Sequence, residues 1–134
     1  MPLEVEWHIP HRVIDARLWG IITSEDTLLL TQHYITMLTE AERHAAGQRV
    51  YLIFDTLKTE SLPPIYKMLK QGLPVLRFKN RGPAFHITHN KSIRSIVDLT
   101  AYVSHFQLYS FTNRDEAMSL LETMLVKDQT NHTR

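Results

Sequence analysis

The side chains best able to do chemistry in this chain are an aspartate and two histidines. Asp55 directly follows the apolar run 50–54, and residues 86–89 read His-Ile-Thr-His. A histidine beside a carboxylate can act as an acid–base pair, and imidazole nitrogens are common zinc ligands. On a strand, however, the odd spacing of His86 and His89 would send their rings to opposite faces. Without an identifiable third ligand we predict no metal site, and an enzyme acting through Asp55 and His89 is the third of three functions considered.

Other polar residues follow the apolar runs in the same way. The pairs are Asp55 and Thr56, His89 and Asn90, and Thr112 and Asn113. Ligands of open α/β sheets gather outside the carboxyl ends of parallel strands, where helix N-termini offer free amides. We therefore expect these pairs to meet at one sheet edge, and one interpretation is that they border a ligand. We favour the alternative, that Asn90 and Asn113 only cap helices and that Asp55 binds loop amides.

The elements that would position these residues follow from the spacing of apolar positions. Alternation of apolar and polar residues predicts strands at 3–9 and 13–22, paired as an antiparallel hairpin. Apolar runs predict further strands at 50–54, 84–88 and 106–111. Helical spacing predicts helices from Thr23 to Gly47, from Pro63 to about residue 71, after Asn90 and after Asn113, and it leaves 73–82 unassigned.

This order predicts a single α/β domain over residues 1–126, followed by a polar tail at 127–134. A chain of 134 residues can bury a core without a metal or disulfides. Helices between successive strands require right-handed crossovers. We therefore expect a five-stranded mixed sheet, with an N-terminal antiparallel hairpin strand and then parallel strands, and about four helices. The absence of cysteine excludes thiol catalysis and thiolate metal sites, and no cofactor is expected.

The charges of the chain are distributed unevenly. Its formal net charge is +1, yet residues 61–97 contain seven bases and no acid. Within residues 57–82, apolar residues such as Phe78 are interleaved with Lys67, Lys70 and Arg77. Such a surface can dock an acidic partner or rest on an anionic membrane, although an amphipathic helix with solvated lysines has the same pattern. Nucleic acid is not expected as a partner, because the total charge is small and no binding motif is present.

Two short motifs carry a family resemblance. The segment 20–26, Gly-Ile-Ile-Thr-Ser-Glu-Asp, leads from the second strand into the first helix, and Phe54-Asp55 closes the third strand. Together with the order of elements, they resemble the SpoIIAA-like, or STAS-type, family over nearly the whole chain. The resemblance implies a non-enzymatic regulator, or a ligand- and lipid-binding module. In its anti-sigma-antagonist branch a serine after the third strand is phosphorylated; Ser61 lies near that place, with shorter spacing and no following glycine.

The favoured function is that of a regulatory module of STAS type, which docks a protein partner through residues 57–82. Asp55, Thr56 and Ser61 would lie beside this surface. The second function is a carrier of a small apolar or anionic molecule, or of a lipid. It would require an apolar cavity between the helix that follows Pro63 and the sheet.

The first hairpin suggests a homodimer contact, and the N-terminus suggests a cellular compartment. Trp19 falls on the same strand face as Asp15 and Arg17, so we expect it to be exposed and to contribute to a homodimer contact. The acidic N-terminus lacks the basic and apolar regions of a signal peptide. We therefore expect a cytoplasmic protein.

Overall fold

Strands and helices alternate along the chain in the order expected from its apolar spacing. The structure, a computed structural model, describes the backbone of residues 2–132 and the side chains of residues 2–129. The elements are β1 (Leu3–Ile9), β2 (Val13–Ile21), α1 (Ser24–His44), β3 (Val50–Ser61), α2 (Ile65–Gly72), the 3-10 helix η1 (Leu73–Arg77), β4 (Arg81–Ile87), α3 (Lys91–Val103), β5 (Leu108–Phe111) and α4 (Arg114–His132).

The strands form one mixed sheet in the order β1-β2-β3-β4-β5. β1 and β2 form an antiparallel hairpin in which Val5 lies opposite Ala16 and Trp7 lies opposite Ile14. The remaining pairs, β2 with β3, β3 with β4 and β4 with β5, are parallel. The predicted fold class, α/β with a five-stranded mixed sheet and four α-helices, is therefore confirmed.

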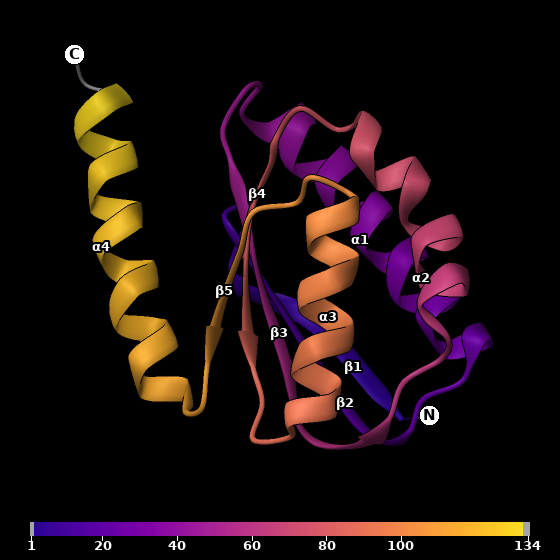
Figure 1. Cartoon of the computed structure of the whole chain (residues 1–134). Coiled ribbons are helices and arrows are strands. Elements are labelled where there is room, and N and C mark those ends of the chain that lie inside the picture. Colours follow the sequence, from indigo (N-terminus) through magenta and orange to yellow (C-terminus); the bar gives the residue numbers. More distant parts are fainter. Residues whose placement is uncertain (1, 133–134) are drawn as a thin grey trace.

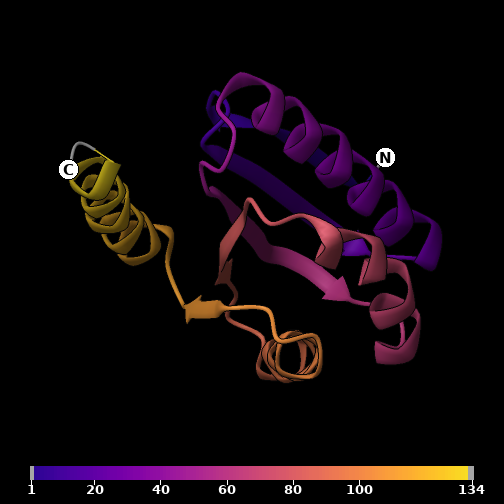
Figure 2. The same ribbon diagram turned by 90° about the horizontal axis from the view of Figure 1, so that it is seen from above.

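The helices cover the two faces of the sheet unequally. α1, α2 and α3 lie on one face, and α4 lies on the other (Figure 1 and Figure 2). The side chains of β3 alternate between these faces: Tyr51 and Ile53 pack with α4, whereas Leu52 and Phe54 point to the opposite side. Burial on both faces explains why residues 50–54 are apolar throughout, as expected for an internal strand.

Side-chain caps fix the starts of three helices. The Thr23 hydroxyl accepts from the Asp26 amide at 3.2 Å, and the Asp26 carboxylate accepts from the Thr23 amide at 2.8 Å, which completes a capping box. The side-chain oxygens of Asn90 and Asn113 each accept from an amide three residues later, at 3.0 and 2.9 Å. The alternative interpretation of Asn90 and Asn113 as helix caps is confirmed.

β3 is longer than predicted. It continues to Ser61, well past the expected end at Phe54. Its second half pairs with β2, where Gly20 lies opposite Thr59, and the ladder contains two irregularities. Because β2 supplies backbone partners, the polar residues 55–61 remain extended. The prediction that Asp55 closes the strand is wrong.

The boundaries of β4 and β5 also differ from those predicted. β4 begins earlier, at Arg81, and β5 begins later, at Leu108. Gly82 permits the early start of β4, because a Cβ atom at this position would lie 2.8 Å from the carbonyl oxygen of Val50. The unassigned segment 73–82 contains η1 and the turn into β4.

α4 continues past residue 126, where the domain was expected to end, and runs to His132. Asp128 attaches this part of the helix to the sheet. Arg49 Nη2 donates to Asp128 Oδ1 at 3.0 Å, and the Tyr51 hydroxyl donates to the other carboxylate oxygen. The predicted polar tail is therefore helical in its described part, and residues 133–134 lie outside the described residues.

Candidate functional site

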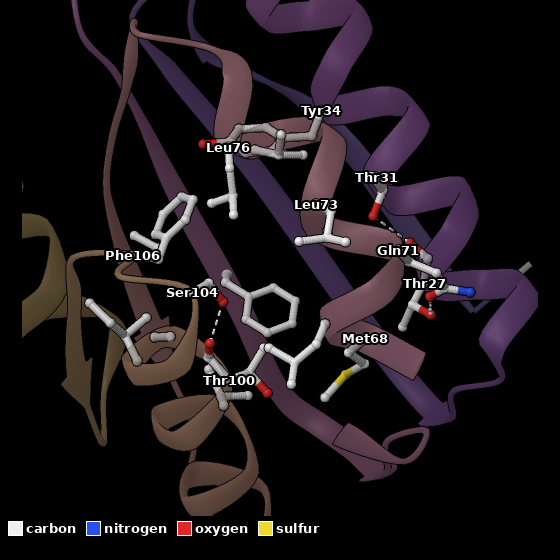
Figure 3. Close-up of a pocket in the computed structure, with 18 of the residues that line it drawn as sticks. Thr27, Thr31, Tyr34, Met68, Gln71, Leu73, Leu76, Thr100, Ser104 and Phe106 are labelled. Carbon is white, nitrogen blue, oxygen red and sulfur yellow. Dashed lines mark hydrogen bonds between the residues drawn. The ribbon is translucent and has the colours of Figure 1, made fainter. Parts of the chain in front are cut away.

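An apolar pocket lies between the sheet and the helices α1, α2 and α3 (Figure 3). Its volume is about 370 Å³. Leu52 and Phe54 of β3 and Ala84 of β4 line it from the sheet, while the three helices and η1 line it from the other sides. Pockets of a few hundred Å³ with mainly apolar walls are typical of small-molecule sites. The cavity that a carrier function requires is therefore present.

The cover of the pocket is α2, and it is attached to α1 by polar contacts. None of the residues of α2 is buried. Gln71 Oε1 accepts from the Thr27 hydroxyl at 2.5 Å, and Gln71 Nε2 donates to the Ser24 carbonyl oxygen at 2.8 Å. Figure 3 shows Met68 of α2 and Leu73 of η1 pointing towards the pocket. α2 thus covers the pocket without burying any of its own residues completely, and Gln71 joins it to α1.

The hydroxyl groups of the pocket wall differ in whether they have a partner. Thr31 and Thr100 donate to carbonyl oxygens of the preceding helical turn, at 3.0 and 2.7 Å, and Ser104 donates to the carbonyl oxygen of Thr100. The Tyr34 hydroxyl is buried and has no hydrogen-bond partner among the described residues. Burial raises the pKa of Tyr34 well above its ordinary value, so the group stays protonated and can donate.

The outer surface of α2 and η1 is basic and partly apolar. Lys67, Lys70 and Arg77, the bases expected to bind a partner, are exposed. Tyr66 and Leu73 are 67% and 59% exposed. Phe78, also predicted to bind, is instead partly buried against the core cluster that contains residues of α1 and η1. The three bases are thus on the surface, whereas Phe78 packs against the core.

Asp55 belongs to an ion-pair network on the α4 face of the sheet, away from the pocket. Arg114 Nη1 donates to Asp55 Oδ2 at 2.9 Å, and the Leu57 amide donates to Asp55 Oδ1 at 3.0 Å. Arg114 also donates to the buried Asp15, which receives a second bond from Arg17 at 3.1 Å. With its oxygens held in this way, Asp55 connects β3 to the start of α4.

Thr56 lies on the opposite face of β3 and is buried beside His86. The Thr56 hydroxyl and His86 Nε2 are 2.8 Å apart, and the same hydroxyl donates to the Ile87 carbonyl oxygen at 3.3 Å. Burial lowers the pKa of His86 from 6.5 to about 4, so the imidazole is neutral near neutral pH. Thr56 and His86 form a buried polar contact and do not line the pocket.

The remaining predicted residues are dispersed over the surface. His89 and Ser61 are exposed, and the side chain of His89 makes no hydrogen bond with Asp55 or with any other described residue. Asn90 is occupied as the cap of α3. Trp19 is 40% exposed, as predicted, while its role in a homodimer stays a prediction. Among the described side chains, those of residues 2–129, no group of three or more histidines, aspartates or glutamates is arranged to hold a metal ion.

The pocket residues of α1 and α3 were not predicted as a site. Tyr34 and Val97 lie on the apolar stripes of α1 and α3, whose helical spacing indicates only that they face inward. Periodicity cannot tell a stripe that packs against another side chain from one that borders a cavity. A weak signal was available in the hydroxyl residues Thr27, Thr31 and Tyr34, which recur on that face of α1.

Comparisons with known proteins assign no family to this chain. A scan against protein-family models found no match, and a search of curated proteins found no significant match. The resemblance to the SpoIIAA-like, or STAS-type, family therefore stays a prediction. None of the helices in the described part of the chain has the length and apolar character needed to cross a bilayer.

Proposed function

We propose that this protein binds a small, mostly apolar molecule in the pocket beneath α2. The observation that carries the proposal is the apolar cavity of about 370 Å³ between the sheet and three helices. Protein interiors are ordinarily packed with few voids larger than a water molecule. Binding of a ligand would explain a cavity of this size on one face of a small domain.

The size of the cavity limits the size of the ligand. An engineered apolar cavity of about 150 Å³ binds benzene. The present cavity, at about 370 Å³, has more than twice that volume. A medium-length acyl chain or a compound of two fused or linked rings fits this space.

The pocket opens to solvent between η1 and the C-terminal end of α3. Leu73 of η1 and Val103 of α3 both line the pocket, yet they are 59% and 51% exposed. Side chains that border a cavity and also contact water mark its opening. Apolar residues around the opening favour an apolar ligand as the molecule that enters.

Native mass spectrometry and a fluorescent probe test this proposal. The protein purified gently from its source should carry a non-covalent adduct of small-molecule or lipid mass, and delipidated protein should bind the neutral probe N-phenylnaphthylamine. Ala101→Phe, which places a ring in the pocket, should weaken probe binding. Tyr102→Phe is the control, because Tyr102 is 81% exposed and does not line this pocket. Equal probe binding by both variants would show that the probe binds elsewhere.

The surface outside α2 supports a second proposal, in which residues 57–82 dock an anionic partner. The supporting observation is that Lys67, Lys70 and Arg77 are exposed beside the apolar residues Tyr66 and Leu73. An acidic protein or an anionic membrane would complement this surface. The two proposals are compatible, because Lys67, Lys70 and Arg77 do not line the pocket.

A further inference from the structure

We infer that the ligand of this pocket carries a carboxylate, which accepts a hydrogen bond from the Tyr34 hydroxyl and is attracted by the Arg81 guanidinium. The inference rests on the proposed function, since it assigns a polar end and an orientation to the molecule in the pocket. It makes Tyr34 the residue that sets specificity within a wall whose other hydroxyl groups, those of Thr27, Thr31, Thr100 and Ser104, are all hydrogen bonded.

The first observation is the unpaired hydroxyl of Tyr34. The residue is 6% exposed and lines the pocket, and its hydroxyl has no partner among the described residues. A buried donor without a partner is destabilising, and phenylalanine would fill the same space without that cost. A tyrosine here is explained if the ligand supplies the acceptor. Figure 3 shows the hydroxyl at the end of the pocket bordered by Leu76 and Phe106.

The second observation is an uncompensated cation at the same end. Arg81 lies with its guanidinium carbon 5.7 Å from the centre of the Phe106 ring, and Phe106 lines the pocket. Arg81 Nη1 donates to the Phe78 carbonyl oxygen at 3.2 Å, but the guanidinium forms no ion pair with a described residue. Its positive charge also opposes the effect of burial on the pKa of Tyr34, so the charge acts at the hydroxyl.

Together these groups give the pocket a polar end and an apolar end. At the polar end the wall carries the Tyr34 donor and no acidic side chain, and the positive charge of Arg81 lies outside the wall, beside Phe106; this arrangement favours an anion over an alcohol or an amine. The apolar end lies under α2, where Met68 and Leu69 line the wall. A monocarboxylate with an apolar chain therefore binds with its head at Tyr34 and its chain beneath α2.

Competition experiments with matched ligands test this orientation. N-phenylnaphthylamine, which is neutral, reports occupancy of the pocket, and decanoate, decanol and decylamine compete for it with the same chain and different heads. Wild-type protein should prefer decanoate. Tyr34→Phe should weaken decanoate about tenfold and decanol by a smaller factor, because a hydrogen bond to a charged group is stronger than one to a neutral hydroxyl. Arg81→Gln should reduce the preference for decanoate over decanol. Tyr109→Phe, on the α4 face of the sheet, is the matched control.

The unfolding midpoint of the ligand-free protein gives an independent test. Tyr34→Phe removes an unpaired hydroxyl and should raise the urea midpoint. A lowered midpoint, or equal affinity of wild type and Tyr34→Phe for decanoate, would overturn the inference while leaving the pocket proposal intact. Failure of wild-type protein to bind the neutral probe or any of the three competitors would instead overturn the proposed function.

Discussion

On the α4 face of the sheet, Tyr51, Phe85 and Ile87 are completely buried, whereas on the opposite face Leu52 and Phe54 border a cavity of about 370 Å³. On the α4 face, the ring of Phe85 packs against two other aromatic rings. The distance between ring centres is 5.5 Å to Tyr109 and 6.2 Å to Tyr51. The two faces belong to the same five strands. Their difference lies in the helices that cover them.

The comparison shows how one sheet can combine a close-packed face with a face that contains a pocket. α4 is a single helix whose apolar residues fit directly onto β3, β4 and β5, and charged contacts attach it at both ends, through Arg114 and Asp128. The other face is covered by α1 and α3 with the short α2 between them, and α2 buries no residue. The close-packed face can therefore stabilise the fold, while the other face leaves room for the ligand that we propose.

The largest expected effect comes from removing a ring from the close-packed face. Phe85→Ala should lower the free energy of unfolding by about 3–5 kcal/mol, the usual range for a buried phenylalanine. Phe54→Ala on the opposite face enlarges an existing cavity and should cost only about 2 kcal/mol, close to the hydrophobic transfer value alone. Urea unfolding measures the loss of unfolding free energy in each variant. Equal losses would show that the two faces are packed equally well.

A somewhat smaller loss is expected from Arg114→Met at the start of α4. Asp15 is 2% exposed, and without Arg114 its buried charge keeps only Arg17 as a partner. Breaking a buried pair from one side costs about 3 kcal/mol. The double variant Arg114→Met with Asp15→Leu should recover much of this loss, because it removes the unpaired charge as well. Lys91→Met, an exposed cation at the start of α3, is the control and should change the unfolding midpoint little.

The pH dependence of stability should reveal His86 on the face that holds the pocket. Burial lowers the pKa of His86 from 6.5 to about 4, so the unfolded chain binds the proton more readily between these values. Stability should therefore be complete above about pH 6.5 and should decline as the pH falls towards 4. The decline is at most about 3 kcal/mol, since one pKa unit corresponds to about 1.4 kcal/mol.

Carboxylates also titrate in this range, so the test compares wild type with His86→Gln. The variant keeps a side chain able to donate to Thr56 but cannot titrate. Its stability should depend less on pH between 4 and 6.5 than that of wild type. Parallel pH curves for the two proteins would mean that His86 titrates normally in the folded state.

The smallest effect on stability is expected on the outer surface of α2 and η1. Reversing Lys67, Lys70 and Arg77 to glutamate should change the free energy of unfolding by no more than about 0.5 kcal/mol each, because these side chains are exposed. Binding to vesicles that contain phosphatidylglycerol, or capture of an acidic partner, should nevertheless be lost. Cosedimentation of the protein with the vesicles measures vesicle binding.

A second triple variant controls for net charge in that experiment. Arg43, Lys91 and Lys127 are exposed bases outside residues 57–82, and their reversal changes the net charge by the same amount. Vesicle binding by this control should remain close to that of wild type. An equal loss in both triple variants would mean that total charge, and not the surface of α2, determines binding.

Local patterns in the sequence were sufficient to predict the architecture. Alternation at 3–9 predicts the first hairpin strand, the continuous apolar run 50–54 predicts an internal strand, and Thr23, Asn90 and Asn113 mark helix starts that the structure confirms. These signals are local, since each depends on neighbours within about one helical turn or a few strand residues. The ends of β3 and α4 were missed, because they depend on distant partners, β2 for one and Arg49 and Tyr51 for the other.

Local patterns did not predict the position of the candidate site. The sequence grouped Asp55, Thr56 and His89 at one sheet edge, but the structure directs Asp55 to Arg114, buries Thr56 beside His86 and leaves His89 in solvent. The pocket instead lies on a sheet face, among residues that all follow ordinary helix and strand patterns. Apolar spacing thus determined by itself which residues turn inward. Only the tertiary structure decided where inward-facing side chains meet one another and where they surround an open volume, because that depends on how α2 spans the gap between α1 and α3.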